Sequence, residues 1–315
     1  MTIVCATHFT ASSSDAVIVA AQLSRRTKQR LWLVTVLPGV RFSTTPPSDR
    51  EQAVHDALNQ EARVLREQGL EVEVAVLHGR VERVLGTLCS EVDARLLVVG
   101  DSHHKPALFA TPVDRIASGV SVPMLVVRSM RPFEAWSRGE QPLKVMLAID
   151  HTWSSALARD WLIGLAEYGP LDVVATHLWS PAEEHARRRG DQTPRTEASD
   201  RALAEELTWE AEAAFRTLPA HIRMRVMLEL GDGHLGDLLL RLAAREQVDM
   251  LVLGTHPQEK GLLARLTAPS TSHEVLSHGL MSVALVPGEL SAQETLRRGT
   301  PTSPRTMKER ARHGP

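Results

Sequence analysis

The chain has 315 residues, a hydrophobic fraction of 43% and a net charge of −2 from 36 basic and 38 acidic side chains. This length suggests about two domains of ~100–200 residues each. The charge balance excludes a broad basic surface for nucleic acid or for an anionic membrane. Only Cys5 and Cys89 are cysteines, which excludes a disulfide scaffold. The chain shows no signal-peptide pattern and no apolar run of about 18 residues, so we expect a cytoplasmic protein.

In the first half, short β-branched runs alternate with longer helical patterns, which is typical of βαβ units and a parallel sheet. The runs are almost wholly apolar, as expected for strands covered on both faces. We expect strands at 3–7, 31–36, 72–77, 96–99 and 123–127. We expect helices at 14–29, 49–66 and 81–89, and a short helix whose first turn holds Pro112. Ser14 and Asp15 are the predicted cap of the first helix.

The second half repeats this scheme. It predicts strands at 145–149, 171–178, 224–230, 250–253 and 283–286, and helices at 154–167, 199–216, 236–245 and 270–278. The letters repeat too, since VCATHFTASSS from Val4 matches MLAIDHTWSSA from Met146. LLVVG ending at Gly100 likewise matches MLVLG ending at Gly254. A repeat of roughly 150 residues indicates a duplicated domain and not a solenoid.

We therefore predict a first copy at 1–130, a linker at 131–142 rich in Pro, Gly and charge, and a second copy at 143–288. The polar tail at 289–315 is expected to be disordered. Each copy is predicted to be an open five-stranded parallel α/β sheet with helices on both faces. The arginine-rich stretch HARRRGD at 185–191 is predicted to be a solvated loop.

An open parallel sheet binds ligands outside the carboxyl ends of its strands. The loops to inspect therefore follow the first and fourth strands of each copy. In the second copy these contain AIDHTWSS, with Asp150, then VLGTHPQEKGLL from Val252 and PSTSHEVL from Pro269.

At these residues the chain resembles the universal stress protein family. The first strand of that family usually ends in Asp before small or hydroxyl residues, and its ATP-binding members carry G-x-x-G followed by G-[ST] after the fourth strand. The resemblance covers nearly all of both copies and is closest to the tandem, E-type members. It implies Rossmann-like domains, related to adenine nucleotide alpha hydrolases, whose fifth strands pair into an intramolecular pseudo-dimer. A further homodimer stays open.

The departures from this pattern predict weak or no ATP binding. Pro257 takes the place of the second glycine, and Pro269 stands where the last glycine belongs. Proline supplies neither the N–H group nor the free φ angle that such a loop uses. Losing two charge-assisted hydrogen bonds would cost ~3–6 kcal/mol, or roughly 10²–10⁴ in affinity.

The resemblance assigns any residual ATP or AMP site to the second copy. Asp150 would bind the ribose or adenine, and Gly254, Gly261, Ser270 and Thr271 would bind phosphate. The stretch GDGHLGD from Gly231 superficially spells the dinucleotide motif G-x-G-x-x-G. It follows the third strand of the copy and not the first, so we interpret it as a strand-to-helix turn.

The first copy has His8 where the family has Asp. His78, His103 and His104 are expected at the same carboxyl edge of the sheet. Imidazoles are common zinc ligands, so His8, His103 and His104 are candidates for a zinc site. The alternative is a set of solvated loop histidines.

The leading interpretation is a non-enzymatic stress-response protein that senses a small ligand or contacts a protein partner. Two alternatives remain open: a weak nucleotide hydrolase that uses Asp150 in the second copy, and a metal-binding regulator that uses the histidines of the first copy.

Overall fold

The computed structural model describes residues 2–37, 47–101, 111–150, 152–189, 196–231, 234–255 and 271–288. Its strands form one ten-stranded sheet in the order β3-β2-β1-β4-β5-β10-β9-β6-β7-β8. All ten predicted strands are present: β1 (Thr2–Ala6), β2 (Arg30–Leu37), β3 (Val72–His78), β4 (Ala94–Gly100), β5 (Met124–Val127), β6 (Leu143–Ile149), β7 (Leu171–Trp179), β8 (Ile222–Leu230), β9 (Met250–Thr255) and β10 (Ser282–Pro287).

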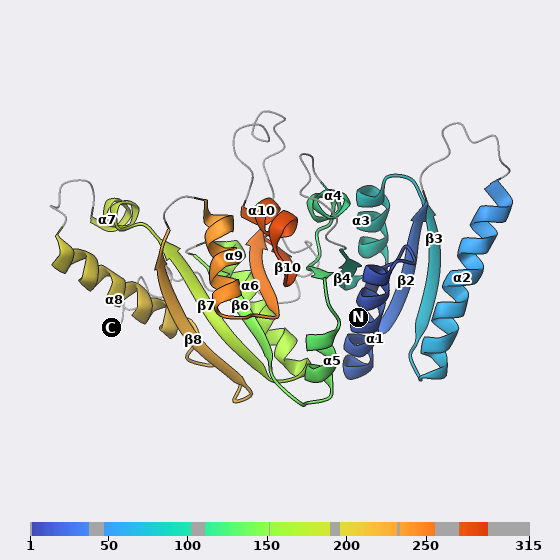
Figure 1. Cartoon of the computed structure of the whole chain (residues 1–315), viewed down its shortest axis with the longest axis horizontal. Helices are drawn as coiled ribbons and strands as arrows, with labels where there is room; N and C mark the ends of the chain where they lie inside the picture. The colour runs from blue at the N-terminus through green and yellow to red at the C-terminus, as the bar shows by residue number, and fades with distance from the viewer. Residues whose placement is uncertain are drawn as a thin grey trace, which may run out of the picture.

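The sheet has two parallel halves that meet at β5 and β10. Each copy contributes five parallel strands, whereas β5 and β10 pair antiparallel, with Leu125 opposite Ala284. The two predicted parallel sheets are therefore joined edge to edge within one chain. Figure 1 shows the resulting arrangement, with the first copy on the right and the second on the left.

Helices cover both faces of the sheet (Figure 1). One hydrophobic core includes residues of α1 (Ala11–Thr27), α2 (Pro47–Glu67), α5 (Arg131–Ser137) and α6 (Trp153–Leu165). The core on the other face includes residues of α3 (Val81–Glu91), α4 (Pro112–Gly119), α9 (Leu235–Arg245) and α10 (Thr271–His278). Each core contains residues of both copies, so the hydrophobic interior continues across the junction.

Threonine side chains fix where several helices begin. The side chain of Thr10 accepts a hydrogen bond from the backbone N–H of Ser13, so α1 begins one turn before its predicted start. The prediction that Ser14 and Asp15 cap this helix is therefore wrong. Asp15 instead accepts a hydrogen bond from the backbone N–H of Met130, at 3.1 Å. Before α4, Thr111 is the cap and Pro112 occupies the first turn, as predicted.

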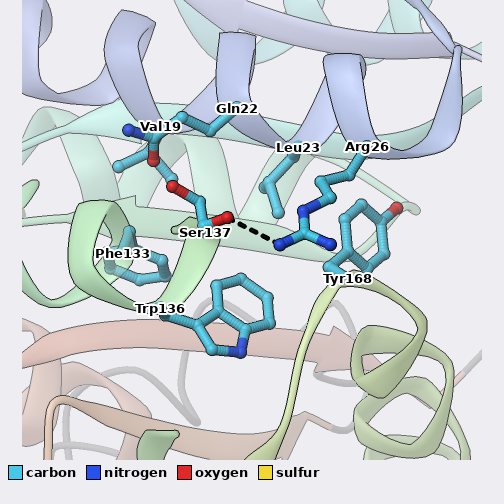
Figure 2. Close-up of a pocket in the computed structure, with 8 residues that line it drawn as sticks. All are labelled: Val19, Gln22, Leu23, Arg26, Phe133, Trp136, Ser137 and Tyr168. Carbon is cyan, nitrogen blue, oxygen red and sulfur yellow. Dashed lines mark hydrogen bonds between the residues drawn. The ribbon is translucent and has the colours of Figure 1, made fainter. Parts of the chain in front are cut away.

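The segment predicted as a linker contains helix α5, which packs between the two copies. Phe133 and Trp136 of α5 are 1% and 2% exposed. The indole Nε1 of Trp136 donates to the carbonyl oxygen of Pro170 at 2.9 Å, and Arg26 donates to that of Ser137 at 2.6 Å. Figure 2 shows the narrow crevice around these side chains. Its cavity volume of about 10 Å³ is far below the ~300–1,000 Å³ of most ligand pockets.

The arginine-rich stretch also differs from its prediction, because its described residues lie in α7 (Pro181–Arg189). His185 is 4% exposed, and its Nε2 lies 2.9 Å from Asp200 Oδ1 on α8 (Glu197–Ala213). Arg188 forms ion pairs with Glu206 at 2.8 Å and Glu210 at 2.6 Å. These contacts hold α7 against α8, so the prediction of a solvated loop is wrong here. The short η1 (Ala166–Tyr168) completes the described helices.

A glycine at the end of the fourth strand lets the first helix of each copy approach the sheet closely. A Cβ atom at Gly100 would lie 2.8 Å from Ser13 Cα and would overlap the Ser12 carbonyl. At Gly254 it would lie 2.8 Å from the backbone nitrogen of Ser155 and would overlap the Ser154 carbonyl. These contacts are with backbone atoms, which cannot rotate away. Both glycines are therefore required by packing.

Gly254→Ala should lower the free energy of unfolding by ~1–3 kcal/mol, because the added methyl group overpacks a backbone contact. Gly164→Ala, on the helix α6 against which Gly254 packs, is the control, since a Cβ there meets nothing within 4 Å. The control should gain up to about 1 kcal/mol from helix propensity. Urea titration of both variants measures the difference, and equal effects would contradict a packing role for Gly254.

Glu61 of α2 places a carboxylate oxygen in the interior of the first copy. Its Oε2 is buried without a hydrogen-bond partner, and burial raises the pKa of this carboxyl above its usual 4.5. The charge of Glu61 also acts on Cys5, since burial and, to a smaller extent, Glu61 raise the pKa of the Cys5 thiol. Since the folded pKa of Glu61 is raised, the protein should be most stable where Glu61 is protonated. That stability is lost as the pH rises through the folded pKa.

Glu61→Met should therefore stabilise the protein by up to about 1 kcal/mol near pH 7, because it removes a half-buried carboxylate with one unpartnered oxygen. The gain should shrink as the pH falls towards 4.5, the usual pKa of the group. Glu67→Met is the control on the same helix, where the Glu67 side chain is 64% exposed. Thermal unfolding across this pH range checks the effect, and a gain that does not change with pH would contradict it.

Candidate functional site

Asp150 follows β6 and opens the predicted ligand loop of the second copy. Its Oδ1 accepts hydrogen bonds from the backbone N–H of Thr152 at 2.8 Å and from the Thr152 hydroxyl at 2.5 Å. Its own backbone N–H donates to Ser155 Oγ at 3.0 Å. Asp150 is exposed, so the loop fixes a carboxylate at the carboxyl end of β6 and presents it to solvent. A carboxylate held in this way has acceptor capacity left for a ligand hydroxyl or N–H.

The equivalent loop of the first copy uses a histidine in the same place. His8 follows β1, and its Nε2 lies 3.0 Å from the hydroxyl of Thr10. The backbone N–H of Thr10 donates to Ser13 Oγ at 2.9 Å. The two loops share one frame, in which the hydroxyl of Thr10 or Thr152 contacts the side chain two residues before it and accepts a hydrogen bond from the backbone N–H of Ser13 or Ser155. They differ in the exposed group, which is an imidazole in the first copy and a carboxylate in the second.

The described histidines of the first copy are not gathered at one point. His8 follows β1 and His78 ends β3, and β2 lies between these strands. Neighbouring strands are ~4.8 Å apart, so the two residues stand about 10 Å apart across the sheet. His78 lies 3.5 Å from Glu51 on α2. Across the described ranges, no group of three or more His, Cys, Asp or Glu side chains could hold a metal ion.

His103 and His104 lie outside the described residues, so the zinc site predicted at His8, His103 and His104 stays a prediction. Of the residues predicted to bind phosphate, some are described and others are not. Gly261 and Ser270 lie outside the described residues, whereas Gly254 and Thr271 are described. Gly254 packs on the first turn of α6, beside the loop of Asp150. Thr271 is the first residue of α10, where backbone N–H groups point away from the helix.

The partners of Asp150 were not predicted from the sequence. Thr152 and Ser155 hold the Asp150 loop, and Thr152 is also the cap of α6. A signal was present, because Thr and Ser spaced by three residues at a helix start are typical of capping.

The glycines of GDGHLGD have a packing role at Gly236. Its backbone N–H donates to Glu274 Oε2 on α10 at 3.1 Å, and a Cβ there would lie 2.5 Å from Glu274 Cβ. Gly236 therefore permits the close approach of α9 and α10. Its φ angle is not in the left-handed region, so close packing and not backbone conformation accounts for the glycine in this strand-to-helix turn.

Neither thiol is available as a nucleophile at neutral pH. Cys5 and Cys89 are both buried. Burial raises the pKa of Cys89 to about 12 and raises that of Cys5 as well. Both side chains therefore stay protonated, and thiolates rather than thiols attack substrates and bind metals.

Comparison with known proteins identifies the domain that is duplicated. The model of the "Universal stress protein family" matches residues 1–128 and again residues 143–287. A universal stress protein from Archaeoglobus fulgidus DSM 4304 has a similar structure, with a TM-score of 0.60 and 15% identity over 91% of this chain and 98% of that one. A functionally unknown protein from Pseudomonas aeruginosa PAO1 has a TM-score of 0.55 and 15% identity, over 91% of this chain and 92% of that one. The search of curated proteins finds no match.

The similar structures confirm the fold. None of the described helices is long and apolar enough to cross a membrane. The family model covers well over half of the chain, once in each copy. The chain therefore belongs to the universal stress protein family and carries its domain twice.

Proposed function

We propose that this chain is a stress-response ligand-binding protein whose second copy holds a small hydroxyl-bearing ligand at Asp150. The observation that carries the proposal is the geometry of that loop. The carboxylate is exposed, yet two hydrogen bonds from Thr152 fix its orientation. A fixed anionic acceptor binds a hydroxyl pair or an amino group with little further loss of conformational freedom.

We further propose that neither copy binds ATP tightly. Gly254 survives from the phosphate motif, but the close contact with Ser154 and Ser155 already requires a glycine there. Its presence is therefore no sign of a working phosphate loop. Pro257 and Pro269 replace the other two glycines of that motif and have no N–H group to donate to a phosphate oxygen.

Binding without hydrolysis fits the groups around Asp150. The described groups that contact it are a backbone N–H and two hydroxyls, from Thr152 and Ser155. Thr152 also caps α6, so its hydroxyl is engaged in the scaffold, and no described cationic side chain contacts Asp150 to stabilise charge on a phosphate during attack. We therefore propose a sensing role in preference to a weak hydrolase.

In calorimetric titrations, ATP should bind no tighter than about 10 µM, and its affinity should be within about tenfold of that of adenosine. Asp150→Ala should weaken adenosine binding by roughly 10–100-fold, because it removes charge-assisted hydrogen bonds. His8→Ala in the other copy is the control and should leave the affinity unchanged. An ATP constant far below this limit would contradict the proposal, as would adenosine binding that survives Asp150→Ala.

Restoring the glycines should restore phosphate recognition. The double variant Pro257→Gly with Pro269→Gly returns two N–H groups to the loop, and ATP should bind at least about tenfold more tightly. Adenosine affinity should not change, because adenosine carries no phosphate. Pro219→Gly, far along the chain from both loops, is the control. Equal gains for ATP and adenosine would show that the prolines do not act on the phosphate group.

A further inference from the structure

The two copies are related by an approximate two-fold axis that passes through their junction. Helices α4 and α10 have eight residues each, and each leads into the fifth strand of its copy. Figure 1 shows the two helices next to each other. In the antiparallel pairing of β5 with β10, Leu125 stands opposite Ala284, and these are equivalent positions in the two copies. The axis therefore passes between Leu125 and Ala284, and each residue near it faces the equivalent region of the other copy.

The residues on the two sides of this axis are unlike. Leu125 and Ala284 are each 1% exposed, so a large side chain faces a small one in a closed interior. Asp114 on α4 and His273 on α10 are also equivalent positions, and they face each other across the junction. Asp114 Oδ1 lies 3.1 Å from His273 Nδ1, with the two side chains 10% and 34% exposed. A carboxylate thus meets an imidazole, and not a second copy of itself.

Arg128 makes several hydrogen bonds across the junction. Its side chain is 3% exposed and bonds to Asp101 of its own copy at 3.1 Å. From the second copy it reaches the carbonyl oxygens of Met281, at 3.0 Å, and of Leu276. Its backbone N–H donates to Ser282 Oγ at 3.2 Å. Burial lowers the pKa of Arg128, so the guanidinium depends on these acceptors in place of water.

The space and the hydroxyl that Arg128 uses in the second copy have no equivalent in the first copy. A Cβ at Gly279 would lie 2.9 Å from Arg128 Nη1, so glycine leaves the space that the guanidinium occupies. The equivalent positions hold different residues: Pro287 for Arg128, Val120 for Gly279 and Pro123 for Ser282. The first copy thus carries the inserting side chain, and the second copy carries the space and the hydroxyl that receive it.

We propose that the β5 edge of the first copy accepts a second copy of the domain and rejects another first copy, so that two chains do not pair through like copies. Pairing two first copies would place Leu125 against Leu125 in a closed interior. It would direct each buried Arg128 at Val120, and it would face Asp114 with Asp114. Overpacking and like charge both disfavour such an interface.

Two second copies fit no better. Ala284 would face Ala284 and leave a cavity, and Pro287 has neither the guanidinium nor the N–H group that the surface around Gly279 and Ser282 receives. Such unlike surfaces discriminate by opposing the wrong pair as well as favouring the right one. The junction therefore closes the chain on itself.

Cysteines placed at the axis distinguish pairing between unlike copies from pairing between like copies. Position 125 faces position 284 when unlike copies pair, whereas it would face position 125 of another chain if two first copies paired. Full-length Leu125→Cys, Ala284→Cys and the double variant are refolded from urea in a glutathione redox buffer. Directly opposite residues of antiparallel strands have Cα atoms ~4.5–5.5 Å apart, which lies within the ~4.4–6.8 Å that a disulfide spans. The double variant should form a bond within one chain, identified by peptide mapping. Neither single variant should form dimers linked through the new cysteine, and the unmodified chain controls for Cys5 and Cys89.

A size exchange at the same pair provides a second measurement. Leu125→Ala places alanine opposite alanine, as in a pair of second copies, and Ala284→Leu places leucine opposite leucine, as in a pair of first copies. Each single variant should lower the urea midpoint of unfolding. The combined exchange should recover most of both losses. The proposal is overturned if a single cysteine variant links two chains through position 125 or 284. It is also overturned if the double cysteine variant gives no bond within the chain, or if the two size effects simply add.

Discussion

The antiparallel pairing of β5 with β10 is the constraint on which the rest of this structure depends. Each copy alone is an open sheet whose fifth strand would expose a row of unpaired N–H and C=O groups, and such an edge invites aggregation. Here each edge covers the other, and the strands around Leu125 and Ala284 become almost fully buried. Because the pairing fixes one sheet to the other, it also fixes which helices of the two copies can touch.

Both faces of the sheet reinforce this pairing in chemically different ways. On one face, α5 lies between the copies, and Trp136 contributes apolar area and a hydrogen bond to Pro170. On the other face, α4 and α10 meet through polar groups, with Arg128 and the pair of Asp114 and His273. The apolar contact tolerates small shifts, whereas a buried guanidinium needs its acceptors in place. The polar face therefore sets the register of the junction, and the apolar face adds buried area.

The fold was predictable from the sequence because apolar strands and amphipathic helices are local patterns. The ten strands follow from β-branched runs, and the duplication follows from repeated letters. Helix α5 was missed because its burial depends on Pro170 and Tyr168 of the other copy, which no local pattern reveals. The cap at Thr10 was missed because several hydroxyl residues compete there. Asp150 was found, but its orientation by Thr152 required coordinates. The phosphate loop stays a matter of sequence, since most of its residues lie outside the described chain.

The differences between the copies separate scaffold from function. In a homodimer, both partners must carry the same residues, whereas a tandem chain lets each copy change alone. Thr10 and Thr152 are the same in both copies because each starts a helix. Gly100 and Gly254 are the same because each receives a helix backbone.

Among the positions that differ, His8 and Asp150 stand at the predicted ligand loops, and Arg128 and Pro287 stand at the junction. Packing therefore fixes the residues that the two copies share. The residues at the predicted ligand loops and at the junction are free of this constraint and differ between the copies. An exposed imidazole and an exposed carboxylate on the same frame would select ligands of different charge. The duplicated fold thus presents a different exposed side chain at the same place in each copy.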